Sequence, residues 1–439
     1  MALQAPMMKK MLRPLTGLLG IALMLGASQA HAVLEVTVTE GVSGAIPVAV
    51  APFEWRGEGE PETRMSGILG DNLHRSGLFE VLREDLPSGA TGPADFIPEP
   101  WGAAGAEYVV VGSKRPDGDR VVVDFHVFDV LAEERLGGWR IPVPADMLRR
   151  GGHRVSDLVF EAITGDPGAF SARIAFVQVQ RDCDGREFRL QVADSDGANP
   201  RTLYRSSDPV MSPAWSPDGN ELVYVSFENR QSEVFRHDVR SGERVSLARF
   251  RGINSAPAWS PDGRYLALSL SRDGSPNIYR LDLQSGDLEQ LTRSSAIETE
   301  PAWSPDGGTI YFTSDRAGAP QIYRMDADGG DVRRLTFESG YAAGVTVSPD
   351  GDSVVYVEGG DGGFRLARLD LGDRRVTRLT DSGNAESPSF APNGSMILYA
   401  ISEGTRGVLG SVSRDGRVHQ RLEGRDGEVR EPAWSPLGE

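Results

Sequence analysis

A five-residue pattern, Trp-Ser-Pro-Asp-Gly, recurs along the C-terminal half of the chain at an almost constant interval. It is intact at 215–219, 259–263 and 303–307, and weaker copies begin at Val347, Phe390 and Trp434. The six starting positions are 44, 44, 44, 43 and 44 residues apart. A fixed period of this length is typical of repeat architectures, in which each repeat is one supersecondary unit.

Each period contains the same succession of short β-type segments. One alternating segment follows the Pro-Asp-Gly turn (265–271), a second and a third come next (277–282 and 288–292), and a fourth precedes the next turn. Four short strands in a unit of this size are typical of one blade of a β-propeller. Pro presets the backbone of a tight turn and Gly tolerates positive φ, so we interpret the repeated Ser and Asp as turn residues and not as catalytic groups.

The last repeat is incomplete, which predicts how the ring closes. The apolar strand at 431–434 is followed by no partners, whereas three strand segments at 173–179, 187–193 and 200–204 stand upstream without a first strand. Pairing the last segment with these three would complete a blade and remove exposed sheet edges. We therefore predict an all-β, six-bladed β-propeller over 172–439, closed by pairing of the C-terminal strand with the first blade.

The first 32 residues have the pattern of a targeting segment. Lys9, Lys10 and Arg13 precede an apolar run at 15–25, and the segment ends in Ala30-His31-Ala32. A positive start, a short apolar core and an Ala-x-Ala ending are typical of a secretory signal peptide. The alternative is an uncleaved membrane anchor. The apolar core argues against it, because it is shorter than the roughly 20 residues that a membrane span needs. Cleavage would leave an exported protein that begins at Val33, with its formal net charge changed from −17 to −20.

The region between the signal peptide and the ring mixes helix and strand signals. Strands are predicted at 46–53, 107–112 and 120–130. One helix is predicted from Met65 to near Gly77 and another over 146–163. These segments predict a small α/β domain at 45–165, joined to the ring by a linker at 166–171. The stretch 33–44 alternates β-branched and polar residues and ends in glycine. It is interpreted either as an edge strand of this domain or as an N-terminal arm that adds a strand to another protein.

Composition excludes several classes of function. An acidic chain repels phosphate backbones, which makes general nucleic-acid binding improbable. A single cysteine, Cys183, excludes internal disulfides and multi-thiolate metal sites, and we interpret it as an unreactive thiol. No Gly-x-Ser-x-Gly pentapeptide is present, which argues against the main enzymatic alternative, an exported propeller hydrolase.

A metal- or sugar-binding propeller is the second alternative. The stretches 194–197 and 326–331 superficially resemble calcium loops, but an EF-hand-type loop needs a Glu at its twelfth position. Those positions hold Arg205 and Phe337, so we interpret both stretches as turns between strands. No cofactor and no metal site are predicted, although an ion in the channel of the ring remains compatible with the sequence.

Several stretches carry a resemblance to a known family. They are 47–55 (PVAVAPFEW), 211–219 (MSPAWSPDG), 299–303 (TEPAW) and 432–436 (PAWSP). Together with the order of signal peptide, α/β domain and six blades, they resemble the TolB family of the Tol-Pal envelope system. The resemblance implies a periplasmic, monomeric, non-enzymatic adaptor without cofactors. Its implied partners are the outer-membrane lipoprotein Pal and the C-terminal domain of TolA, with bacteriocins using the same propeller site in related proteins.

The resemblance also implies which residues bind these partners. The residues that would face Pal are Met211, Ile253, Asn254, Ala256, Thr299, Glu300 and Glu386. Family members often carry His at the place of Ile253, and 341–344 departs from the usual polar loop. Without the family resemblance, Glu300 and Glu386 are interpreted equally well as solvent-exposed loop carboxylates with no binding role. The arm that would bind TolA consists of Val33, Leu34, Glu35, Val36, Thr37, Val38, Thr39, Glu40, Gly41, Val42, Ser43 and Gly44.

Overall fold

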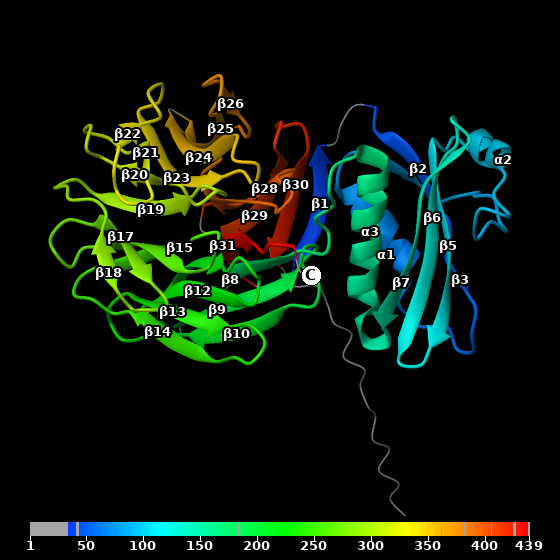
Figure 1. The fold of residues 1–439 in the computed structure, drawn as a ribbon, viewed down its shortest axis with the longest axis horizontal. Helices are drawn as coiled ribbons and strands as arrows, with labels where there is room; N and C mark the ends of the chain where they lie inside the picture. The colour runs from blue at the N-terminus through cyan, green and yellow to red at the C-terminus, as the bar shows by residue number, and fades with distance from the viewer. Residues whose placement is uncertain are drawn as a thin grey trace, which may run out of the picture. The chain divides into compact units, whose positions relative to one another are not determined.

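The computed structural model describes residues 34–40, 44–182, 185–360, 362–381, 383–404, 406–424 and 427–437. The expected signal peptide (1–32), Val33, Cys183 and the arm residues at 41–43 lie outside these ranges. Within them, no helix has both the length and the apolar composition that crossing a bilayer requires. The described strands form seven sheets, one in an N-terminal domain and six in a ring (Figure 1).

The N-terminal sheet has the order β4-β2-β5-β6-β7, with β3 paired to β5. Its strands are β2 (Ile46–Val50), β3 (Glu54–Trp55), β4 (Phe79–Leu82), β5 (Tyr108–Asp117), β6 (Arg120–Asp129) and β7 (Glu134–Pro144). β2 runs parallel to β4 and β5, whereas β5, β6 and β7 are antiparallel.

Two helices pack on this sheet and against each other. α1 (Met65–Arg75) contacts β2 and β4, and α3 (Leu148–Thr164) contacts β6 and β7. Apolar side chains at helical spacing, such as Leu69 and Leu73 of α1 and Val155 and Val159 of α3, are buried in the core beneath them. α3 ends at Thr164, and the following Gly165 has a positive φ of 79°, the left-handed C-cap conformation that glycine favours. The short helices α2 (Pro98–Ala103) and η1 (Ala145–Met147) complete the domain.

The ring consists of six antiparallel sheets, one per blade, which confirms the predicted propeller. Blade one contains β31 (Glu428–Trp434), β8 (Arg173–Asp182), β9 (Gly185–Asp194) and β10 (Arg201–Ser206). Blade two contains β11 (Val210–Trp215), β12 (Glu221–Ser226), β13 (Glu233–Asp238) and β14 (Arg244–Ala248). Blade three contains β15 (Asn254–Trp259), β16 (Tyr265–Leu270), β17 (Asn277–Asp282) and β18 (Leu288–Gln290).

The other three blades follow the same order. Blade four contains β19 (Glu298–Trp303), β20 (Thr309–Ser314), β21 (Gln321–Asp326) and β22 (Arg333–Arg334). Blade five contains β23 (Tyr341–Val347), β24 (Ser353–Gly360), β25 (Gly363–Asp370) and β26 (Val376–Arg378). Blade six contains β27 (Ala385–Phe390), β28 (Met396–Glu403), β29 (Arg406–Ser413), β30 (His419–Gly424) and a fifth strand, β1 (Leu34–Glu40).

The repeated pattern forms a turn and a contact between blades. The hydroxyl of Ser260 donates to Asp262 Oδ1 at 2.5 Å and accepts the Tyr265 N–H at 2.8 Å, which fixes the turn. The same two bonds recur at the serines of blades two, four and five. The preceding Trp259 donates from Nε1 to the carbonyl of Ala214 in the neighbouring blade at 3.3 Å. These residues thus act in the fold, as turn chemistry predicts.

Strand β1 lies elsewhere than in the N-terminal sheet, which corrects one of the two interpretations of 33–44. It pairs antiparallel with β30, from Leu34 opposite Gly424 to Glu40 opposite His419. Leu34 is 1% exposed and packs with apolar side chains of blades one and six. The burial of this side chain, together with the free edge of β30, accounts for the choice of partner.

Candidate partner-binding surface

The six inner strands of the ring share one local distortion near their starts. In each blade the pairing of the inner strand with its neighbour shifts register after the second or third residue. A residue with positive φ stands at this shift, and such β-bulges re-aim side chains. The six positions are Ser212, Ala256, Glu300, Gly344, Ser387 and Glu431. We call the surface formed by these residues and the two or three residues before each of them the bulge face.

Three carboxylates lie close together on the bulge face. Glu300 Oε2 accepts the Gly344 N–H of the next blade at 2.8 Å and the Thr313 hydroxyl at 2.8 Å. Glu431 Oε2 accepts the Ser212 N–H of the next blade at 3.2 Å. Burial raises the pKa of Glu431, and the charges of Glu386 and Glu300 raise it further. The three groups therefore share one negative field, which favours hydrogen-bond donors or cations from a partner.

Apolar side chains border these carboxylates on three consecutive blades. Ile253 is 48% exposed and Ile297 is 52% exposed, each placed directly before an inner strand. Tyr341 holds the corresponding position in blade five, and its ring lies 5.1 Å from that of Phe364. Burial and the nearby charges of Glu300 and Glu386 raise the pKa of Tyr341, so its hydroxyl stays a donor at neutral pH. Exposed apolar side chains beside clustered charges are typical of a protein-binding surface.

Most of the residues expected to face a partner lie on the bulge face. Met211, Thr299 and Glu386 are the second residues of β11, β19 and β27, while Ala256 and Glu300 occupy bulge positions. Glu386 is exposed and accepts the Ser402 hydroxyl at 3.1 Å. The geometry of the inner strands thus brings together residues that are up to 175 positions apart in the sequence.

Asn254 requires a correction, because it cannot face a partner. Its side chain is 0% exposed. Nδ2 donates to the carbonyls of Phe250 and Ser232, and Oδ1 accepts the Phe250 N–H at 2.8 Å. A buried amide with these partners shapes the loop that presents Ile253 and offers nothing to a binding protein.

Three further residues, Ile297, Tyr341 and Glu431, also belong to this surface. Ile297 and Tyr341 stand 44 and 88 positions after Ile253, so the repeat period itself would have found them. Glu431 holds the bulge position of blade one. The repeated turn pattern begins only at Trp434, so it does not single out Glu431. Between blades six and one, a polar cavity of about 320 Å³ adjoins Glu386 and Glu431. Arg181 in its wall pairs with Glu428 at 2.6 Å, so this part of the face is charged and not apolar.

The N-terminal arm forms a second candidate site. Val36 and Val38 pair with Leu422 and Gln420 of β30, and the Thr39 hydroxyl donates to the His419 carbonyl at 3.1 Å. Leu34 is the buried anchor, and adding a Cβ to Gly197 would place it 2.4 Å from the Leu34 Cβ. Gly197 belongs to the turn after β9, so the arm contacts that turn as well as β30. The arm therefore occupies its own propeller by strand addition.

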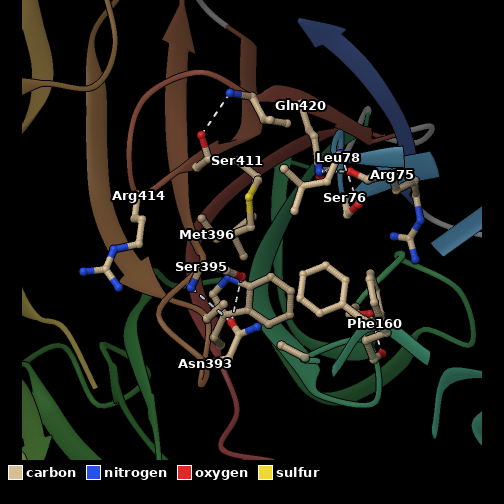
Figure 2. A pocket seen from close by; sticks show the side chains of 18 of the residues that line it. Arg75, Ser76, Leu78, Phe160, Asn393, Ser395, Met396, Ser411, Arg414 and Gln420 are labelled. Carbon is tan, nitrogen blue, oxygen red and sulfur yellow. Dashed lines mark hydrogen bonds between the residues drawn. The ribbon is translucent and has the colours of Figure 1, made fainter. Parts of the chain in front are cut away.

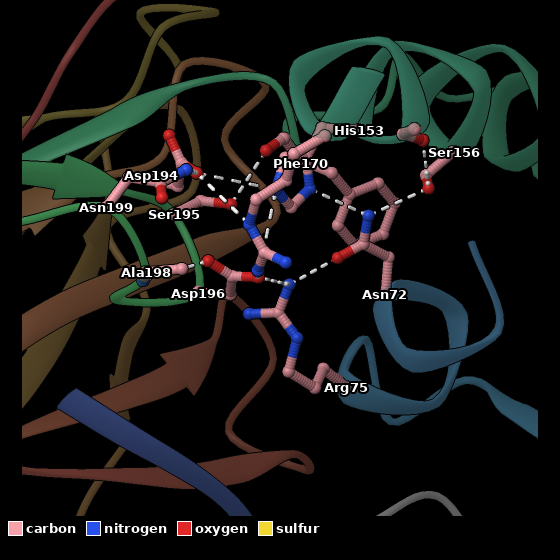
Figure 3. A network of polar contacts seen from close by, with 12 residues as sticks. Asn72, Arg75, His153, Ser156, Phe170, Asp194, Ser195, Asp196, Ala198 and Asn199 are labelled. Atoms are coloured by element: carbon pink, nitrogen blue, oxygen red, sulfur yellow. Dashed lines mark hydrogen bonds and ion pairs between the residues drawn. The ribbon is translucent and has the colours of Figure 1, made fainter. Parts of the chain in front are cut away.

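The same turn carries the stretch 194–197 that resembled a calcium loop. His153, Asp194 and Asp196 bring possible ligand atoms within 4.8 Å of one another. Arginines already fill this place: Arg149 pairs with Asp196 and, at 3.3 Å, with Asp194. Arg75 lies 4.0 Å from Asp196, as Figure 3 shows. We call these five residues, with Asn72, the helix–turn cluster. Two guanidinium groups balance its two carboxylates, so it does not fit a divalent cation.

The protonation of His153 supports this conclusion. Asn72 Nδ2 lies 2.9 Å from His153 Nδ1 and 2.8 Å from the Ser156 hydroxyl, while Asn72 Oδ1 accepts from Arg75. The amide therefore donates to Nδ1, and the ring proton is on Nε2, the atom that faces the carboxylates. Burial lowers the pKa of His153 to about 4. Burial opposes ionisation of Asp196 too, but Arg75, His153 and Arg149 hold its pKa below the usual value.

Comparison with known proteins gives the family. A model of the TolB amino-terminal domain matches residues 34–136, and a model of the TolB β-propeller domain matches residues 160–438. The chain belongs to the TolB family. Tol-Pal system protein TolB of Thioalkalivibrio sulfidiphilus is 56% identical over 98% of this chain and 99% of its own length. The relative from Nitrosococcus oceani is 57% identical over 96% of this chain and 98% of its own length.

A solved structure of a TolB family member supports the same assignment. The crystal structure of TolB from Acinetobacter baumannii is 38% identical and superposes with a TM-score of 0.85. It is matched over its whole length and covers 92% of this chain. The family assignment thus extends over both the N-terminal domain and the six blades.

Proposed function

We propose that the protein is a non-enzymatic periplasmic adaptor of the Tol-Pal system. In this proposal the bulge face binds Pal, and the arm of residues 33–44 binds the C-terminal domain of TolA. The adaptor supports outer-membrane integrity and the inward movement of that membrane during division. The observation that carries the proposal is full-length similarity to proteins named Tol-Pal system protein TolB, at 56% and 57% identity.

The chemistry of the bulge face supports the assignment of Pal to it. Ile253, Ile297 and Tyr341 offer apolar contact area on adjacent blades, and Glu300 and Glu386 offer acceptors beside it. The bulge backbone is fixed by hydrogen bonds between blades, so the surface is formed before a partner arrives. A preorganised surface loses little conformational entropy on binding.

The two sites are coupled in this proposal. Pal on the bulge face favours the arm paired with β30, and release of Pal frees the arm for TolA. Such coupling is reciprocal, so each partner must change the affinity of the other by the same factor.

A charge placed in the apolar row tests the Pal site. We expect Ile297→Asp to weaken binding of purified Pal at least tenfold in titration calorimetry, because it buries a carboxylate against the partner. Val245→Asp is the matched control, since Val245 is 39% exposed but lies on β14, the outer strand of blade two. Equal affinities of both variants and the unmodified protein would contradict the proposed surface.

A pull-down tests the assignment of the arm. Protein beginning at Val33 should capture Pal and the TolA C-terminal domain, whereas protein lacking 33–44 should capture Pal alone. Loss of both partners, or retention of both, would show that the arm is not the TolA site. Hydrolytic turnover without capture of either envelope protein would favour the enzymatic alternative.

A further inference from the structure

A cavity of about 300 Å³ lies between the N-terminal domain and blade six (Figure 2). Its lining includes none of the six bulge residues. Its walls come from the ends of α1 and α3, the segment 166–170 and strands β28, β29 and β30. Apolar side chains from both sides form most of these walls, namely Leu78, Phe160, Phe170, Met396, Leu398 and Trp434. This volume is within the range of small-molecule sites, which favour domain interfaces.

Two polar groups in the wall, the Ser411 hydroxyl and the Trp434 indole N–H, have an unused hydrogen-bonding capacity among the described residues. Ser411 lies on β29 and is only 3% exposed. Its backbone belongs to the ladder with Gln420, but its hydroxyl has no hydrogen-bond partner among the residues that the structure describes. The other serines of the wall are engaged: Ser195 donates to the Phe170 carbonyl at 2.7 Å, and Ser413 donates to Asp415 at 2.6 Å. Trp434 Nε1 in the same wall is a buried donor without a hydrogen-bond partner among the described residues. A buried donor without a partner is costly, and a ligand acceptor could satisfy it as well as the Ser411 hydroxyl.

The charged groups of the wall argue for a neutral ligand. Arg417 pairs with Asp415 at 2.6 Å, and Arg414 pairs with Asp350 at 3.3 Å. Arg75 donates to Asn72 within the helix–turn cluster. Since the arginines of the wall already have acidic or amide partners, an anionic ligand would have to displace one of these contacts.

We propose that this cavity binds a small neutral molecule with a ring-sized apolar body and one hydroxyl or carbonyl group, which pairs with the Ser411 hydroxyl. The ligand contacts Phe160 and Phe170 on one side and Met396 and Leu398 on the other. It therefore bridges the N-terminal domain and the propeller, next to the contact in which Gln420 Nε2 donates to the Arg75 carbonyl. Because only the native arrangement forms the cavity, binding raises the melting temperature.

Three probes of similar size test the chemistry of the site. They are 2-naphthol, which has one hydroxyl, naphthalene, which has none, and 2-naphthoate, which is an anion. We expect 2-naphthol to bind with one-to-one stoichiometry in fluorescence titration and to bind more tightly than either of the others. Failure of 2-naphthol to bind, or tighter binding of 2-naphthoate, would overturn the proposal.

Two substitutions locate the bound probe. Ser411→Ala should weaken 2-naphthol binding about five- to tenfold and leave naphthalene binding unchanged, because one hydrogen bond is lost. Met396→Trp should fill the cavity and abolish binding of both. Ser269→Ala is the control, since Ser269 is equally buried but donates to the Glu298 carbonyl in another part of the ring. Circular dichroism verifies the fold of each variant, and unchanged binding by a folded Met396→Trp protein would place the probe elsewhere.

Discussion

Two strands from opposite ends of the described chain join blades of the propeller, and they differ in how strongly they are held. β31 is the inner strand of blade one, where it pairs with β8 and contacts strands of blades six and two. β1 is the outermost strand of blade six, paired with β30 along one edge. β31 is thus surrounded by neighbouring strands, whereas β1 covers the outer edge of blade six.

Side-chain contacts enlarge this difference. In β31, Val429 and Ala433 are buried, the Ala433 carbonyl accepts Trp215 Nε1 at 3.2 Å, and Glu431 accepts the Ser212 N–H. In β1, by contrast, Leu34 is fully buried while Thr37 and Thr39 are exposed. Strands at a sheet edge can be exchanged for strands of another protein, whereas an inner strand of a closed ring cannot leave without opening it. We infer that the two ends have different roles, one fixing the ring and the other exchanging partners.

Removal of β31 has the largest expected effect on this comparison. Ending the chain at Gly427 would leave blade one with three strands and would remove the acceptor of Trp215 Nε1. We expect a loss of more than about 5 kcal/mol of stability, enough to unfold the ring at room temperature, because several buried side chains and a full ladder are lost together. Thermal melting followed by circular dichroism measures this.

Removal of β1 is the matched control for that deletion. Protein that begins at Gly44 loses a strand of the same length, seven residues. We expect it to remain folded and to melt cooperatively within a few degrees of the intact protein. If the two deletions shift the melting temperature equally, the proposed difference between the ends is wrong.

A smaller change separates docking of the arm from the stability of the ring. Leu34→Asp would place a carboxylate among Ile174, Phe176 and Leu398, so the arm should leave β30 while the ring stays folded. Amide exchange measures this directly, and we expect exchange at Val36, Val38 and Leu422 to accelerate at least tenfold.

An exposed position on the same strand supplies the control. Thr37 is exposed, so Thr37→Asp introduces the same charge on β1 and leaves the buried packing of Leu34 intact. Slow exchange in Thr37→Asp and fast exchange in Leu34→Asp would establish Leu34 as the anchor. Fast exchange in both would mean that charge alone releases the arm.

Local patterns predicted the ring because each blade repeats the same turn and the same four strands. The expected strands at 265–271 and 277–282 correspond to β16 (Tyr265–Leu270) and β17 (Asn277–Asp282), and the expected helix at 146–163 corresponds to α3 with a short helix before it. These features depend on residues close in sequence, which is where periodicity and turn chemistry are informative.

Features that depend on distant residues were not predictable in the same way. The alternation in 33–44 indicates a strand but does not identify its partner, and β30 lies about 380 residues away. The helix–turn cluster joins Asn72, His153 and Asp196, whose spacing has no recognisable pattern. The family resemblance implied that Asn254 faces a partner, whereas its side chain is buried and holds the preceding loop through the Phe250 carbonyl.

The smallest expected effect concerns the helix–turn cluster. Its turn also contains Gly197, which packs against Leu34 of the arm. His153 is surrounded by Asn72 and Arg75 of α1, Arg149 of α3, and Asp194 and Asp196 of the turn. Burial lowers the pKa of His153 from 6.5 to about 4, so the unfolded chain binds this proton more readily. The contribution of the buried neutral His153 to the free energy of unfolding is therefore fully present above about pH 6.5. It is lost as the pH falls toward 4.

Replacing the imidazole tests this dependence. His153→Asn retains an oxygen that can accept from Asn72 but removes the titrating ring, and we expect it to lessen the loss of unfolding free energy between pH 6.5 and 4.5 by on the order of 2 kcal/mol. His74→Asn, on the exposed side of α1, controls for the loss of a histidine from the chain. Denaturant titrations at several pH values measure the difference. A buried neutral imidazole must make the free energy of unfolding fall as the pH decreases from 6.5 to 4.5. If His153→Asn retains the full pH dependence of the unmodified protein, groups other than His153 cause that dependence.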